Sequence, residues 1–183
     1  PQGLPPRLLV LGTGGTGKTV LTKQIVVDLC SQMLGRERFP DNPDHGVVPF
    51  RLVLQDVGRL LAKLVGWGVV EAYLADTHGP TSAQLAAARL VRERELRALL
   101  VLDGFDEAPG RRGRILDWIE SFDEDVGIIV TSRPAAIHGF QEVFGRIGNR
   151  KGRARGQIWE FGRVIDGSCF RRGVLCFRTD RRF

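Results

Sequence analysis

The sequence predicts an α/β fold of three layers, in which helices cover both faces of a parallel sheet of four to five strands. Two observations lead to this prediction. Short, continuously apolar runs alternate along the chain with longer segments whose apolar residues recur at helical spacing. Apolar runs without polar alternation are typical of strands that are buried on both faces of a parallel sheet. A chain of 183 residues, of which 43% are hydrophobic and 26% charged, suits one such globular domain.

The first elements are a strand, a glycine-rich loop and a helix. Residues 7–11 form a short apolar run between prolines and a glycine, which predicts a buried strand. Glycines dominate residues 12–19, and the apolar residues of 20–34 then lie three and four positions apart, as on one face of a helix. A polar loop with two prolines follows at 36–46, and β-branched and apolar residues predict a second strand at 47–54.

The middle of the chain is predicted to be helical up to a third strand. Leucines on one face indicate a helix at 57–64, and a further helix is expected at 69–74 before a break at 76–80. Residues 81–95 are rich in Ala and Leu and begin with Thr and Ser, which favours a helix with a capped start. The apolar run 99–103 predicts a strand that ends in an aspartate.

One more helix and one more strand complete the regular pattern. Apolar residues at helical spacing predict a helix at 114–122, in which Trp118 is expected to belong to the core, and residues 127–131 form a fourth apolar strand. The periodicity stops near residue 144. Beyond it, only residues 157–161 or 174–177 have the composition of an additional edge strand.

The charge divides the chain into two parts. Residues 1–144 carry 16 Lys and Arg against 18 Asp and Glu, whereas residues 145–183 carry 11 against 3. We therefore predict a globular domain over 1–144 and a basic, Gly- and Arg-rich tail over 145–183 that is poorly structured or an aberrant C-terminus. A basic tail can bind nucleic acid or anionic lipid, but a solvated extension is the simpler interpretation. We expect no nucleic-acid partner.

Membrane spanning and disulfide bonding are not expected. The chain has no run of about 18 apolar residues, the length that a transmembrane helix needs. Its cysteines, Cys30, Cys169 and Cys176, are far apart and form no pair with metal-site spacing. A reducing compartment fits this usage, so the sequence predicts a cytoplasmic location without a membrane partner.

The loop at residues 12–19 is the strongest chemical signal in the sequence. Its letters G-T-G-G-T-G-K-T fit the phosphate-binding pattern G-x-x-x-x-G-K-[ST] at every fixed position. Glycines allow backbone N–H groups to converge on phosphate oxygens, and the N-terminus of the following helix adds partial positive charge. The pattern predicts that Lys18 contacts the β- and γ-phosphates and that the Thr19 hydroxyl binds Mg²⁺. The residues expected to contact the nucleotide are Gly12, Thr13, Gly14, Gly15, Thr16, Gly17, Lys18, Thr19 and Val20.

The second chemical signal is an acidic cluster at the end of the third strand. Residues 99–107 read L-L-V-L-D-G-F-D-E, so the strand ends at Asp103, and Asp106 and Glu107 follow closely. A carboxylate at this place is suited to hold Mg²⁺, directly or through water. One of the two following acids is suited to orient and deprotonate the water that attacks the γ-phosphate.

These motifs resemble those of NACHT domains, which belong to the STAND class of P-loop NTPases. The segment L-L-V-L-D-G-F-D-E is similar to the Walker B motif of this family, I-I-V-T-S-R-P at 128–134 to its sensor segment, and V-P-F-R-L-V-L at 48–54 to its second strand. The resemblance covers roughly residues 7–144. The helical and winged-helix subdomains that follow in the family have no counterpart in 145–183, so the resemblance implies a module truncated after the sensor strand.

The resemblance implies an ATP/ADP-operated switch in signal transduction. It assigns the phosphates and Mg²⁺ to Lys18 and Thr19, Mg²⁺ to Asp103, and sensing of the γ-phosphate to Arg133, whose guanidinium is suited to bidentate phosphate contact. ATP hydrolysis by such a module is expected to be slow or absent. Self-association and protein partners would involve domains that lie outside this chain.

Two other interpretations remain open from the sequence. The first is a P-loop enzyme outside signalling, either a small-molecule kinase with Arg111, Arg112 and Arg114 in a lid or a DNA-dependent ATPase that uses the basic tail. For these arginines a solvated turn is the simpler interpretation. The second is a truncated fragment without function.

Overall fold

The computed structural model describes residues 7–36, 47–93, 96–123, 126–136 and 157–160. Its centre is a sheet in which every neighbouring pair of strands is parallel, in the order β2-β3-β4-β1-β5. The strands are β1 (Leu8–Leu11), β2 (Val47–Val53), β3 (Arg97–Asp103), β4 (Gly127–Ser132) and β5 (Gln157–Glu160).

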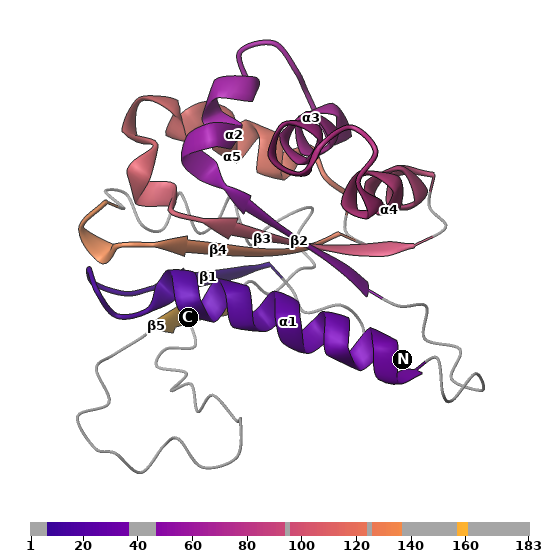
Figure 1. Ribbon diagram of the computed structural model, residues 1–183. Helices are drawn as coiled ribbons and strands as arrows, with labels where there is room; N and C mark the ends of the chain where they lie inside the picture. The colour runs from indigo at the N-terminus through magenta and orange to yellow at the C-terminus, as the bar shows by residue number, and fades with distance from the viewer. Residues whose placement is uncertain (1–6, 37–46, 94–95, 124–125, 137–156, 161–183) are drawn as a thin grey trace.

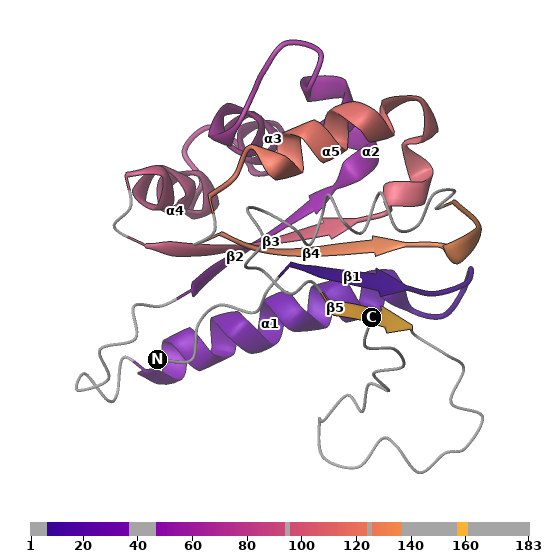
Figure 2. The same ribbon diagram turned by 180° about the vertical axis from the view of Figure 1, so that it is seen from behind.

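Helices cover both faces of this sheet, so the predicted three-layer α/β fold is confirmed. Figure 1 shows α1 (Lys18–Arg36) below the sheet and a second helical layer above it, and Figure 2 shows the same layers from behind. The upper layer consists of α2 (Leu54–Leu60), α3 (Trp67–His78), α4 (Ala83–Arg92) and α5 (Arg112–Glu120).

The side chains of the strands alternate between two apolar layers. On one face, Leu99, Val101 and Ile129 pack with Leu21 and neighbouring residues of α1. On the other face, a larger cluster joins the strands to α2, α3, α4 and α5, and its centre includes the fully buried Leu100 and Leu102. Because both sides of each inner strand are buried, the strands need apolar residues at nearly every position, which explains the continuous apolar runs.

Several helix boundaries differ from the sequence prediction. Helix α2 begins at Leu54, directly after β2, whereas the sequence predicted strand to this residue and helix only from 57. The side chain of Leu54 is fully buried in the core beneath the helices. The sequence did not indicate this, because an apolar residue directly after an apolar strand also fits a longer strand. Helix α3 extends to His78, three residues into the predicted break, and ends where Gly79 takes a φ of 90°. Helix α4 is shorter than predicted.

The start of α4 has a local cause. The Ser82 hydroxyl accepts a hydrogen bond from the backbone N–H of Leu85 at 3.3 Å, which is the arrangement of an N-cap. Helix α5 begins at Arg112, two residues earlier than predicted, and Trp118 is buried as expected, at 3% exposure. Its indole Nε1 donates to the Gly66 carbonyl at 2.9 Å, so the polar atom of this core residue is satisfied.

The basic tail contributes one described element. Strand β5 pairs with β1 in parallel, so one of the two candidate edge strands is present and the sheet has its fifth strand. The other candidate, at 174–177, lies outside the described residues, as does most of the predicted tail. None of the helices in the described ranges is long and apolar enough to cross a membrane.

We expect the centre of the sheet to dominate stability. Leu100→Ala removes a fully buried side chain from β3 and should lower the free energy of unfolding by about 2–5 kcal/mol, because it leaves a cavity. The matched change Leu90→Ala, at a side chain that is 38% exposed on α4, should lower it by about 0.5 kcal/mol or less. Urea unfolding followed by circular dichroism measures both, and similar losses for the two variants would contradict this description of the core.

Candidate functional site

The loop between β1 and α1 contains the glycine-rich motif. Gly15 and Gly17 have φ angles of 76° and 88°, in the left-handed region that other residues rarely adopt. A Cβ at either position would meet no heavy atom within 4 Å, so the space beside both glycines is open. Successive backbone N–H groups in such a loop, followed by a helix N-terminus, form a concave site for anions.

Lys18, the first residue of α1, folds its side chain back over this loop. Its Nζ donates to the carbonyl oxygens of Gly12 at 2.6 Å and Thr13 at 2.9 Å. The Thr16 hydroxyl donates to the same Thr13 carbonyl at 2.8 Å. The backbone N–H of Gly12 donates to Ser132 of β4 at 3.1 Å, which ties the loop to the neighbouring strand.

A cavity of about 330 Å³ lies where three strands end. Strands β1, β3 and β4 are parallel neighbours, so the segments that follow them meet at one edge of the sheet, on the left of Figure 1. The lining residues come from the segments after β1, β3 and β4, and they are Gly14, Gly15, Gly17, Lys18, Thr19, Val20, Asp103, Gly104, Asp106, Glu107 and Arg133.

The structure thus brings together most of the residues that the sequence singled out. Gly12, Thr13 and Thr16 are the predicted contact residues that do not line the cavity. Their hydrogen bonds lie within the loop, to Lys18 or to β4, so they shape the loop.

Asp103 lies at the end of β3, and side chains from three other elements hold its carboxylate. The Thr131 hydroxyl of β4 donates to Oδ1 at 2.8 Å. The Arg51 guanidinium of β2 donates to Oδ2 at 2.5 Å, and the Thr22 hydroxyl of α1 lies 3.4 Å from the same oxygen. The Asp103 side chain is 8% exposed, so these contacts compensate the cost of burying its charge.

Asp106 forms a second ion pair, with Arg133. The Arg133 Nε lies 2.9 Å from Oδ2, and the Arg133 backbone N–H donates to Oδ1 at 3.1 Å. The Asp106 side chain is 7% exposed and that of Arg133 is 55% exposed. A Cβ built on Gly14 would lie 3.9 Å from the Arg133 guanidinium carbon, so this guanidinium lies between the acidic turn and the glycine-rich loop.

The turn that presents the acids depends on Gly104. This residue has a φ of 82°, and the short 3₁₀ helix η1 (Phe105–Glu107) follows it. Arg112 donates to the Asp106 carbonyl at 3.2 Å and lies over the Phe105 ring, so it supports the turn, unlike the solvated arginine that the sequence suggested. Glu107 is exposed, and its side chain has no hydrogen bond or ion pair with another described residue.

The side chains that hold the Asp103 carboxylate were not predicted from the sequence. Arg51 is a charged residue within the otherwise apolar strand β2. Because such a residue usually needs a partner of opposite charge, the sequence could have indicated that Arg51 pairs with an acid. Thr22 and Thr131 carried no comparable signal, because threonine is common in helices and strands with no role in a site.

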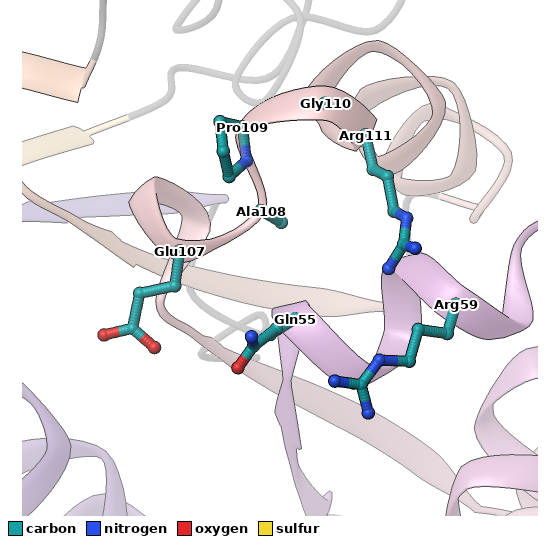
Figure 3. A pocket seen from close by; sticks show the side chains of 7 residues that line it. All are labelled: Gln55, Arg59, Glu107, Ala108, Pro109, Gly110 and Arg111. Atoms are coloured by element: carbon teal, nitrogen blue, oxygen red, sulfur yellow. The ribbon is translucent and has the colours of Figure 1, made fainter.

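A second cavity of about 370 Å³ lies beside the first, and Glu107 lines both. Figure 3 shows Gln55 and Arg59 of α2 on one side of it and Arg111 of the short helix η2 (Pro109–Arg111) on the other. Arg59 is paired with Asp56 at 3.1 Å, and both side chains are largely exposed. The charged residues that line this cavity, Arg59, Glu107 and Arg111, are all exposed, so it contains no buried charged group.

The donor set at the first cavity fits Mg²⁺ that arrives with a ligand. No group of three or more His, Cys, Asp or Glu within the described ranges is arranged to hold a metal. Thr19 and Asp103, however, both line the cavity and offer a hydroxyl and a carboxylate. Mg²⁺ prefers such oxygen donors and commonly takes only one or two from the protein, with phosphate oxygens and water completing its shell.

A parallel sheet with this glycine-rich loop after its first strand and an acidic strand end beside it defines a P-loop NTPase. Residues 7–147 match the family model described as NACHT domain, so the chain belongs to the NACHT domain family, as its motifs suggested. No curated protein sequence matches the chain. A similar solved structure is that of the Aeropyrum pernix ORC1 protein in complex with DNA, with a TM-score of 0.49 and 19% sequence identity. The similarity covers 86% of this chain and 40% of that protein, so this chain spans less than half of its length.

We expect Gly104 to be required for the acidic turn. Gly104→Ala places a Cβ at a positive φ and 3.2 Å from the Glu107 carboxylate, which should lower the free energy of unfolding by about 1–2 kcal/mol. Gly113→Ala adds the same methyl group within α5, where no heavy atom lies within 4 Å, and should leave stability equal or slightly higher. Urea unfolding compares the two, and equal stability of both variants would contradict the role of Gly104.

Proposed function

We propose that the chain binds ATP and ADP with Mg²⁺ in the cavity at the sheet edge and hydrolyses ATP slowly. The observation that carries this proposal is the convergence of Lys18, Thr19, Asp103, Asp106 and Arg133 on one cavity beside the glycine-rich loop. Membership of the NACHT family supports placing the module in an ATP/ADP-operated signalling protein of the STAND class.

Phosphate binding begins with an exchange of partners by Lys18. Its ammonium lies on the carbonyls of Gly12 and Thr13, which are neutral acceptors. A charged phosphate oxygen is the stronger acceptor, so the β- and γ-phosphates draw the ammonium toward the cavity. The N–H groups of the glycine-rich loop and the start of α1 then hold the same phosphates.

The metal would be held by two oxygen donors that line the cavity. The Thr19 hydroxyl and the Asp103 carboxylate are the groups of this chain that would hold it. Bound Mg²⁺ supplies neutralisation of the charge on the phosphate oxygens.

Recognition of the γ-phosphate is linked to activation of water through the Asp106–Arg133 pair. A γ-phosphate competes with Asp106 for the Arg133 guanidinium, which lies beside the glycine-rich loop. Withdrawal of the guanidinium leaves the nearly buried Asp106 carboxylate without its cation, which makes it a better proton acceptor. We assign the general base to Asp106, and Glu107 is the alternative.

Slow turnover is expected because no further cation of the described residues lines the cavity to stabilise charge in the transition state beyond Lys18 and Arg133. The proposed contacts involve the phosphates and the metal of the nucleotide and do not identify its nucleobase. We propose adenine nucleotides because of the family, and the binding measurement below tests them against GTP.

Lys18→Ala should weaken ATP and ADP binding by about tenfold or more, because it removes charge-assisted hydrogen bonds to the phosphates. Lys23→Ala removes the same charge from an exposed position of α1 and should leave both affinities unchanged. Calorimetric titration with ATP, ADP and GTP in Mg²⁺ measures the effect. Equal affinity of wild type and Lys18→Ala, or no binding by the folded wild type, would refute the proposed function.

Asp106→Asn should lower the rate of ATP hydrolysis by about a hundredfold or more while ATP still binds, because the amide cannot accept the proton from water. Glu107→Gln is the isosteric control and should change turnover much less. Phosphate release under single-turnover conditions measures both variants. Loss of turnover in Glu107→Gln alone would move the general base to Glu107.

Arg133→Ala should weaken ATP binding relative to ADP binding, because the proposed guanidinium contact to the γ-phosphate is lost. We expect the ratio of the two affinities to fall by about tenfold, with ADP affinity little changed. Competition between unlabelled nucleotides and a fluorescent ADP analogue measures the ratio. An unchanged ratio would exclude Arg133 as the γ-phosphate sensor.

A further inference from the structure

Arg51 occupies a place that no step of the proposed function uses. It comes from β2, the edge strand next to β3, and its Nη2 lies 2.5 Å from the Asp103 Oδ2. Its Nε donates to the Thr22 hydroxyl at 3.0 Å, and that hydroxyl donates to the Thr19 carbonyl at 2.9 Å. Arg51 is therefore connected both to the metal-binding carboxylate and to the first turn of α1.

Both oxygens of Asp103 have partners within the protein. Thr131 donates to Oδ1, whereas Oδ2 receives Arg51 and lies near Thr22. A hydroxyl is a neutral donor that can remain in place beside a metal ion. A guanidinium carries a full positive charge on the same carboxylate, so it opposes a divalent cation there.

We propose that Arg51 is a built-in counter-ion of Asp103 that competes with Mg²⁺ and sets the Mg²⁺ concentration at which the nucleotide site accepts the metal. The inference rests on the proposed function and deepens it. Arg51 acts through Asp103 and is a positioning residue. Its own side chain is 23% exposed at the sheet edge, against 8% for Asp103, so the guanidinium has access to solvent when it moves aside.

The competition has two consequences of opposite sign. Without Mg²⁺, Arg51 neutralises a nearly buried carboxylate that would otherwise repel the phosphates of a nucleotide. With Mg²⁺, the same positive charge repels the cation, and the attraction between Arg51 and Asp103 must be given up. Removal of the charge should therefore strengthen metal binding and weaken metal-free nucleotide binding.

The test measures the affinity of a fluorescent ADP analogue over a series of free Mg²⁺ concentrations that starts in excess EDTA. Arg51→Met should lower the midpoint Mg²⁺ concentration by about tenfold or more and should weaken binding in EDTA. Arg51→Lys retains the charge and should keep the midpoint within about threefold of wild type. Arg89→Met removes an exposed arginine from α4 and should match wild type throughout.

Misfolding cannot produce the expected pattern, because it would weaken binding both with and without Mg²⁺. An unchanged or higher midpoint in Arg51→Met overturns the inference while the proposed function stands. If wild type binds no nucleotide at any Mg²⁺ concentration, the inference and the proposed function fail together.

Thr22→Val provides a second variant if Arg51→Met does not fold. It removes the hydroxyl that accepts a hydrogen bond from Arg51 Nε without changing any charge. The guanidinium is then held less firmly against the Asp103 carboxylate. The midpoint Mg²⁺ concentration should fall by about threefold. A midpoint equal to that of wild type in this variant also overturns the inference.

Discussion

The site depends on compensation of the buried charge of Asp103. A carboxylate with 8% exposure is costly unless donors surround it, and here they come from β4, β2 and α1 through Thr131, Arg51 and Thr22. These elements are far apart in the sequence, so one carboxylate links strands β2, β3 and β4 to the helix that follows the glycine-rich loop. The position of the acid is determined by the fold around it.

The same principle extends to the other charges at the sheet edge. Lys18 has carbonyl acceptors, Arg133 has Asp106, and Arg51 has Asp103, so each of these cations already has a partner. A ligand must replace those contacts with better ones, and its affinity is the difference between the two sets. Phosphate oxygens are stronger acceptors for these cations than backbone carbonyls are, and a divalent metal competes with the cations for the carboxylates, which is why we propose a highly charged ligand.

Much of the fold followed from local patterns. The strands were predicted because sheets covered on both faces need continuous apolar runs. The glycine-rich loop was predicted because the spacing of its glycines, lysine and threonine matches the pattern of a phosphate-binding loop. The helix ends differ from the prediction: Leu54 belongs to α2, where its side chain packs in the helical core, and α3 continues to His78. Such boundaries depend on packing, which a local window of sequence does not contain.

The sequence by itself determined the class of protein, the glycine-rich loop and the set of acids at the end of β3, because each is encoded in a few consecutive residues. The tertiary structure decided which groups hold those acids. Strand order places β4 between β1 and β3 and sets β2 against β3, so Thr131 and Arg51 reach Asp103 across distances of 28 and 52 residues in the chain. A buried carboxylate needs hydrogen-bond donors, and the order of the strands decides which donors lie within reach of it.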